Sequence, residues 1–256
     1  MGLPTVADLD RVRWITFNRP ETANALRVED LDHVADAVRD LGGEIRAIVF
    51  TGAGERTFSA GMHLDAFRDL TPITARRLIA RVADFLRAVR RSPVPTVAML
   101  NGTCLGAALE LALACDIRIA HPAVRLGLPE VKLGIPSVAD AALLPAFVGL
   151  SRAREMILTG DLYDLEAFGP GFANRVAEPE RLRAATLAML EKLTGHTPQV
   201  IAAQKSLFET WLNNGITTSV SSSVDVFGDL FDDPATAEAV ERYQHRTPRS
   251  ARGGTP

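Results

Sequence analysis

The sequence has 256 residues, of which 47% are hydrophobic and 23% charged, proportions typical of a soluble globular protein with a sizeable core. Its 28 basic and 31 acidic residues give a net charge of -3, which argues against a general nucleic-acid-binding protein. The first ten residues lack the pattern of a secretory signal, and no apolar run approaches the ~18 residues of a membrane span. We therefore expect neither nucleic acid nor membrane as a partner.

The cysteines and histidines indicate the compartment and the absence of a metal. Cys104 and Cys115 are the two cysteines of the sequence, and so few predict reduced thiols in a cytoplasmic protein. The five histidines are scattered and show no metal-ligand spacing, so we predict no metal site.

The first two thirds of the chain predict alternating strands and helices. Apolar residues in alternation or in short runs predict strands over residues 5–9, 12–17, 47–50, 96–100, 116–120 and 124–128. Apolar residues at helical spacing predict helices over residues 28–41, 74–91 and about 106–114. The recurrence of strand, strand and helix with short connections places this part in the α/β class.

From about Val138 onward the sequence predicts helices almost without interruption, with new helices starting at Pro198, Ile216 and Pro234. Helices that follow an α/β core suggest a packing or assembly module. We therefore divide the chain into a core (residues 1–195), a helical assembly region (196–246) and a tail (247–256). The tail is rich in Arg, Gly, Ser and Pro, which predicts disorder.

Candidate chemistry is concentrated in three segments. They are Phe58-Ser-Ala-Gly-Met-His-Leu64, Asn101-Gly-Thr-Cys-Leu-Gly-Ala-Ala-Leu-Glu-Leu-Ala-Leu-Ala-Cys-Asp116 and Leu128-Pro-Glu-Val-Lys-Leu-Gly-Ile-Pro136. In the second segment Glu110 lies on a helix with almost no polar face. Apolar surroundings disfavour ionisation of a carboxyl group, which suits it to acid–base work near neutral pH. The structural alternatives are an ion-paired or partly exposed Glu110 and a simply exposed Glu130.

In order and context these segments resemble the enoyl-CoA hydratase/isomerase (crotonase) family, over nearly the whole chain. The resemblance implies a spiral of repeated ββα units, followed by a C-terminal helical region that builds trimers, often paired into hexamers. It also implies an acyl-CoA substrate and no separate cofactor. The thioester carbonyl would sit between the backbone N–H groups of Met62 and Ala107, which would stabilise an enolate.

The resemblance also assigns roles to particular side chains. Glu110 and Glu130 match the two catalytic glutamates of the hydratases, which hold a water molecule between them. The CoA moiety is expected at Ala23, Ala60, Arg27 and Arg246. Relatives often carry a phosphate-binding lysine where this chain has Glu21, so Arg27, Arg56 or Arg246 would have to replace it.

Two polar residues depart from the family pattern, and each has a structural alternative. His63 stands where relatives often have Asp, and it is either new chemistry near the pocket or a surface histidine. Asp140 is either a third acidic group, as in some isomerase relatives, or part of a helix start. In the second case Ser137-x-x-Asp140 would form a capping-box-like motif at the helix N-terminus. Six residues are candidates for the acyl-tail pocket, although a place in the core is the preferred interpretation of each: Phe67, Leu70, Phe85, Leu143, Phe227 and Phe231.

Hydration of a 2-enoyl-CoA to a 3-hydroxyacyl-CoA is the leading prediction, because both glutamates are present. Isomerisation of a Δ3 to a Δ2 double bond needs only one carboxylate and is the first alternative. Another reaction on a CoA thioester and a non-catalytic CoA- or RNA-binding paralogue are the others. A Rossmann oxidoreductase is disfavoured, because Thr51-Gly-Ala-Gly54 lacks the Gly-x-Gly-x-x-Gly spacing.

Overall fold

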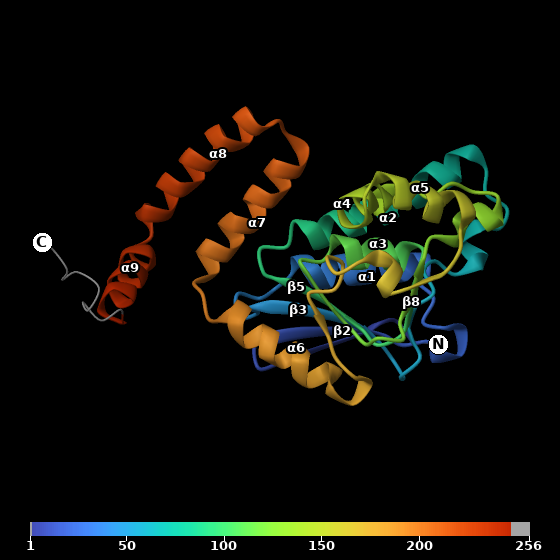
Figure 1. Ribbon diagram of the computed structural model, residues 1–256, viewed down its shortest axis with the longest axis horizontal. Coiled ribbons are helices and arrows are strands. Elements are labelled where there is room, and N and C mark those ends of the chain that lie inside the picture. Colours follow the sequence, from blue (N-terminus) through green and yellow to red (C-terminus); the bar gives the residue numbers. More distant parts are fainter. Residues whose placement is uncertain (1, 247–256) are drawn as a thin grey trace, which may run out of the picture.

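The computed structural model describes residues 2–246, and its strands form two sheets (Figure 1). The larger sheet contains β1 (Thr5–Leu9), β2 (Val12–Phe17), β3 (Ala47–Gly52), β5 (Thr96–Leu100), β7 (Ile117–Ala120) and β10 (Arg175–Val176), in that order. The smaller sheet contains β4 (Thr57–Ser59), β6 (Thr103–Leu105), β8 (Arg125–Gly127) and β9 (Tyr163–Asp164). Only β1 and β9 run antiparallel to their neighbours within these two sheets.

The chain alternates between the two sheets and adds a helix after each pair of strands. β3 enters the larger sheet, β4 the smaller, and α2 (Pro72–Arg90) follows. β5, β6 and α3 (Ala107–Ala114) repeat this order, and β7 and β8 begin it again. The predicted spiral of ββα units is therefore confirmed.

Helices cover both faces of the larger sheet. α1 (Val28–Arg39), α2 and α3 lie on one face and α6 (Pro179–Thr194) on the other (Figure 1). Side chains alternate accordingly along β3, where Ile48 and Phe50 pack toward the first group of helices and Val49 packs toward α6. All three are fully buried, which explains why β3 reads as a continuous apolar run in the sequence.

The C-terminal third is less uniformly helical than the sequence predicts. It contains α4 (Leu144–Val148), α5 (Leu150–Thr159), α7 (Pro198–Asn213), α8 (Ile216–Asp229) and α9 (Pro234–Arg246), so the three predicted helix starts are confirmed. The prediction of helices almost without interruption did not include β9 and β10, which add one strand to each sheet. Each has only two residues, too few to produce a periodic pattern.

The tail assigned to residues 247–256 lies outside the described residues. Within residues 2–246, no helix combines the length and apolar character needed to cross a bilayer.

Two buried asparagines hold the loops that lead to the smaller sheet. Asn24 donates from its amide nitrogen to the carbonyl oxygens of Ala53 (3.0 Å) and Thr57 (2.8 Å). Asn101 donates to the carbonyls of Gly52 (2.9 Å) and Gly54 (2.8 Å) and accepts from the Gly52 N–H (3.0 Å). These side chains satisfy the backbone between β3 and β4, where no strand partner is available.

Replacing Asn101 by Ala should lower the free energy of unfolding by about 2–4 kcal/mol, because it leaves several buried backbone groups without partners. Asn214→Ala is the matched control, since the exposed Asn214 amide makes a single bond to Thr210 and should cost no more than ~0.5 kcal/mol. Urea denaturation of both variants would measure the difference. Equal losses would show that Asn101 does not hold the loop.

Candidate active site

Parallel pairing in the smaller sheet brings together the three segments that the sequence singled out. β4 pairs with β6 through Ser59 and Cys104, and β6 pairs with β8 through Leu105 and Gly127. Because the three strands are parallel, their carboxyl ends lie along one edge of the sheet. The segments after β4, β6 and β8 contain Met62, Ala107 and Glu130, respectively.

Two glycines allow the first two of these segments to touch. Gly61 has φ = +84°, and a Cβ there would lie 2.6 Å from the carbonyl oxygen of Leu105 and 3.2 Å from the Ala107 nitrogen. Gly106 has φ = +54°, and a Cβ there would lie 2.8 Å from Oε1 of Glu130. A side chain at either position would therefore be both strained and crowded.

This contact leaves two backbone amides available at the same place. The parallel bridge between Leu26 and Met62 uses the Gly61 carbonyl (2.8 Å) and the His63 N–H (2.7 Å), so the Met62 N–H faces away from Leu26. Ala107 is the first residue of α3, where an N–H has no acceptor within the helix and the helix dipole is positive. Both are suited to hold an anionic oxygen.

A cavity of about 250 Å³ opens between these amides and both glutamates. Its polar lining comes from Glu110, Glu130 and Lys132, and Met62, Gly106 and Ala107 contribute at the sheet edge. The remaining lining is mostly apolar and comes from Ala60, Leu64, Phe67, Ile79, Val82, Pro129, Leu133, Ile135, Pro136 and Val138. The four predicted catalytic and oxyanion residues thus share one apolar cavity.

Glu110 is buried, with only 3% of its surface exposed, so the exposed alternative is wrong. The ion-paired alternative is not supported either, because within residues 2–246 the carboxyl group accepts from a backbone N–H and forms no ion pair. Burial, with a smaller contribution from the negative charges of Glu130 and Asp140, raises the pKa of Glu110 to about 8. The backbone N–H of Asp140 donates to Oε2 of Glu110 (3.2 Å) and acts in the opposite direction. Glu110 therefore holds its proton near neutral pH.

Glu130 lies in a short 3₁₀ helix, Pro129–Leu133, and is half-buried rather than fully exposed. Burial raises its pKa, whereas hydrogen bonds from its own backbone N–H and from Ser137 lower it. The Ser137 hydroxyl donates to Oε2 of Glu130 over 3.0 Å. Near pH 7 the two carboxyl groups thus differ in environment, which is what an acid–base pair requires.

The capping-box interpretation of Ser137 and Asp140 is wrong. The hydroxyl of Ser137 bonds to Glu130, and the short helix Ala139–Leu143 has no side-chain cap. The Asp140 side chain does not line the cavity but forms an ion pair with Arg90 at the end of α2. Asp140 reaches the site through its backbone N–H, a contact that no sequence pattern predicts.

His63 serves a local structural purpose and does not line the cavity. Its Nδ1 accepts a hydrogen bond from the Asp65 N–H (3.2 Å) at the start of the short helix Leu64–Phe67. This supports the structural alternative for His63. No cluster of three or more His, Cys, Asp or Glu side chains in residues 2–246 is arranged to hold a metal ion.

The predicted CoA-binding residues lie mostly near one another. The Ala60 N–H donates to the Ala23 carbonyl (2.9 Å), and Ala60 lines the cavity. Arg27 precedes α1 and lines a separate hollow of about 230 Å³ together with His63. The backbone of Arg246 ends α9, but its side chain lies outside the described part of the chain.

The six acyl-tail candidates lie in three kinds of place: in the cavity, in or against the core, and at the surface. Phe67 lines the cavity, and Phe85 is a core residue that is 1% exposed. Leu143 is half-buried against the core. The expectation that all six fit the core is wrong for Leu70, Phe227 and Phe231, which are 37%, 65% and 54% exposed. Ile79 and Val82, on the inner face of α2, line the cavity instead.

Comparison with known proteins shows the family of this chain. The family model described as "Enoyl-CoA hydratase/isomerase" matches residues 9–250, and the chain therefore belongs to that family. It is 34% identical over 244 residues to the putative enoyl-CoA hydratase/isomerase YngF of Bacillus subtilis, covering 93% of each chain. It is 29% identical over 238 residues to the short-chain-enoyl-CoA hydratase of Clostridium acetobutylicum, covering 91% of each.

The fold agrees as well. The structure of Pseudomonas aeruginosa DspI superimposes with a TM-score of 0.90 at 31% identity and covers 96% of this chain and 95% of that one.

Glu110→Gln should stabilise the folded protein, and more so as the pH rises from 5 to 8. An unfolded glutamate ionises near its ordinary pKa of 4.5, whereas folded Glu110 ionises near 8. Folding therefore takes up a proton in this window, and the wild type loses stability as the pH rises through it. The neutral amide should avoid this loss and gain about 1–3 kcal/mol at pH 8.

Urea denaturation at pH 5 and pH 8, at one protein concentration, would measure this gain. Glu191→Gln, an exposed position on α6, is the control and should show no gain that depends on pH. A Glu110→Gln variant that is destabilised at pH 8 would contradict the assignment of a buried, protonated Glu110.

Proposed function

We propose that this protein hydrates a 2-enoyl-CoA to a 3-hydroxyacyl-CoA. The observation that carries the proposal is that Glu110, Glu130 and the amides of Met62 and Ala107 line one cavity. The substrate's thioester oxygen would accept hydrogen bonds from the two amides, and its Cα–Cβ double bond would lie beside the two carboxyl groups. No cofactor is needed beyond the CoA that the substrate carries.

The chemistry follows from the charge that develops during addition of water. Attack of water at Cβ moves electrons toward the thioester oxygen, and two fixed N–H donors stabilise the resulting enolate. One carboxylate must accept a proton from the water, and one carboxylic acid must deliver a proton to Cα. Near neutral pH, burial and the neighbouring charge keep Glu110 protonated, so the pair holds one acid and one base.

Hydration is favoured over Δ3,Δ2 isomerisation because both carboxyl groups are oriented toward the cavity by dedicated donors. Ser137 fixes Glu130, and the Asp140 N–H fixes Glu110. A proton shuttle between two carbons would need only one of them. The same two glutamates also argue against a non-catalytic CoA- or RNA-binding role. The relatives named as hydratases support this choice.

The apolar lining further suggests an aliphatic acyl group. Phe67, Ile79 and Val82 face the cavity from one side, and Leu133, Ile135 and Val138 from another part of the chain. The CoA moiety would extend from Ala60 toward Ala23 and Arg27, with Arg246 as a further phosphate partner. We propose that the protein works in fatty-acid metabolism in the cytoplasm, where the free thiols of Cys104 and Cys115 would stay reduced.

Glu110→Gln and Glu130→Gln should each lower the hydration rate of crotonyl-CoA by at least about a hundredfold, because each removes one partner in proton transfer. Hydration is followed by loss of the enoyl-thioester absorbance, and a 3-enoyl-CoA assayed in parallel reports isomerisation. Glu191→Gln is the control and should keep the wild-type rate. Wild-type rates in both glutamate variants, or turnover of the 3-enoyl-CoA alone, would contradict hydratase function.

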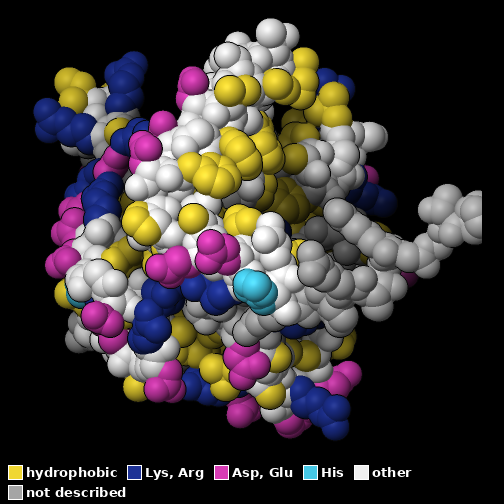
Figure 2. All heavy atoms as spheres, turned by 90° about the vertical axis from the view of Figure 1, so that its left-hand side faces the viewer, with side chains coloured by type: hydrophobic (Ala, Val, Ile, Leu, Met, Phe, Trp, Pro, Cys, Tyr) yellow, Lys and Arg dark blue, Asp and Glu magenta, His cyan; other side chains and the backbone are white. Residues whose placement is uncertain are grey.

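We also propose that the chain assembles as a homotrimer or as a hexamer made of two trimers. α8 and α9 project from the core (Figure 1), and Figure 2 shows hydrophobic side chains gathered around a hollow on this side. The large hydrophobic residues exposed on α7–α9 include Phe208, Trp211, Leu212, Ile216, Val220, Val224, Phe227 and Phe231. Apolar surface of this extent in a single chain indicates a protein interface.

Val224→Asp combined with Phe227→Asp should reduce the mass in solution from three or six chains to one. Val224 and Phe227 are 66% and 65% exposed, and a buried charge at an interface would oppose assembly. Leu158→Asp is the control, because Leu158 is 73% exposed but lies on α5. Light scattering after gel filtration measures the mass. A monomeric wild type would contradict the proposed assembly.

A further inference from the structure

One loop, residues 137–140, contacts both glutamates of the site. The Ser137 hydroxyl donates to Glu130 and the Asp140 N–H donates to Glu110. Ala139, between them, has φ = +46°, a left-handed conformation that a non-glycine residue adopts only where its surroundings enforce it. The position of both carboxyl groups thus depends on what holds this loop.

The Asp140 side chain ties the loop to another element of the fold through an ion pair. Its carboxylate pairs with the guanidinium of Arg90, at the end of α2, and the two side chains are 10% and 21% exposed. Burial raises the pKa of Asp140, and the hydrogen bond and positive charge of Arg90 oppose that shift. Removal of Arg90 would leave the buried Asp140 carboxylate without its partner. Either the loop would then move toward solvent or the Asp140 carboxylate would take up a proton.

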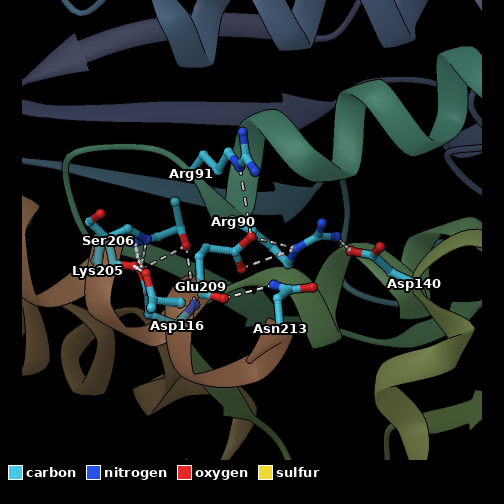
Figure 3. Close-up of polar contacts among 10 residues, drawn as sticks. Arg90, Arg91, Asp116, Asp140, Lys205, Ser206, Glu209 and Asn213 are labelled. Atoms are coloured by element: carbon cyan, nitrogen blue, oxygen red, sulfur yellow. Dashed lines mark hydrogen bonds and ion pairs between the residues drawn. The ribbon is translucent and has the colours of Figure 1, made fainter. Parts of the chain in front are cut away.

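Arg90 is itself held from a third element. Its Nε lies 3.2 Å from Oε1 of Glu209 on α7, whose side chain is 14% exposed (Figure 3). A planar guanidinium can contact two carboxylates in different directions at once, which a single ammonium group cannot do in the same way. Arg90 therefore links the first helix of the assembly region to the loop beside the cavity.

We propose that Arg90 is a positioning residue, which holds Glu110 and Glu130 in place through Asp140 and the 137–140 loop, with Glu209 orienting it from α7. The inference rests on the proposed hydratase function. Arg90 does not line the cavity, so it acts on the reaction through the loop and makes no contact with the acyl group. The geometry of the site then depends on how α7 packs against the end of α2.

The test compares Arg90→Gln with Arg91→Gln. Arg91 is the adjacent arginine, is 68% exposed and lies 3.9 Å from Glu209, but it has no contact with Asp140 among the described residues (Figure 3). Arg90→Gln should lower kcat on crotonyl-CoA about 10- to 100-fold with KM within about twofold, because a small misplacement of reacting groups is costly. Arg90→Lys should restore part of kcat, and Arg91→Gln should change neither constant by more than about twofold.

A second readout does not depend on activity. In hydrogen exchange followed by mass spectrometry, the peptide covering residues 137–143 should exchange about tenfold faster in Arg90→Gln than in the wild type or Arg91→Gln. Glu209→Gln should cause a smaller change in the same peptide and a kcat loss of about two- to fivefold. If Arg90→Gln yields no folded protein, Arg90→Lys and Glu209→Gln provide the same two readouts.

Unchanged exchange over residues 137–143 would overturn the inference, whatever the activity. Faster exchange with an unchanged kcat would overturn it too, because the loop would then not position the glutamates. A wild type that does not hydrate crotonyl-CoA would count against the proposed function, and the exchange of the loop would still decide whether Arg90 holds it.

Discussion

Parallel pairing of β4, β6 and β8 is the constraint on which the rest of the site depends. Two residue pairs join β4 to β6 and two join β6 to β8, and these four pairs fix the register of three short strands. That register places the segments after β4, β6 and β8 side by side. Each segment contributes one group: the Met62 amide, the Ala107 amide and the Glu130 carboxyl. The larger sheet and its helices supply the buried support that holds such short strands in place.

The site also depends on keeping a carboxyl group where it is costly to ionise. α3 is buried along its whole length, and Glu110 lies one turn inside it. At the far end, the buried Arg118 donates to the carbonyls of Ala112 (3.1 Å) and Cys115 (2.7 Å), which satisfies two acceptors at the carboxyl end of the helix. A rigid helix held at both ends gives the carboxyl group little freedom to reach solvent. Burial of Glu110 therefore has two effects: it raises the pKa of the carboxyl group, and it costs the folded protein stability at pH values where that group ionises.

The sequence predicted those features that local pattern controls. Runs of apolar residues located the strands of the larger sheet except β10, the strand β8 and the helices α1, α2 and α3. The apolar setting of Glu110 predicted its burial. The strands β4, β6, β9 and β10 were missed, because segments of two or three residues carry little periodicity. Exposure of Phe227 was missed, because an apolar helix face indicates burial without saying whether the covering surface belongs to the same chain.

Contacts between distant residues were beyond the reach of the sequence. Arg90 is separated from Asp140 by 50 positions and from Glu209 by 119, so no spacing relates them. Ser137 was interpreted as a helix cap because its spacing to Asp140 matched a capping box. Only the folded chain shows that its hydroxyl donates to Glu130 instead. The candidate site could thus be located from the sequence, whereas the contacts that hold it could not.

The two amides at the sheet edge have a consequence for how this site tolerates change. Any residue except proline carries the N–H that Met62 and Ala107 provide, so their side chains can vary while the anion-binding property persists. Their neighbours Gly61 and Gly106 have no such freedom, because a Cβ would meet the Leu105 carbonyl at one and the Glu130 carboxyl at the other. In a set of diverged sequences, the invariant positions would therefore be the glycines, one residue before the groups that act.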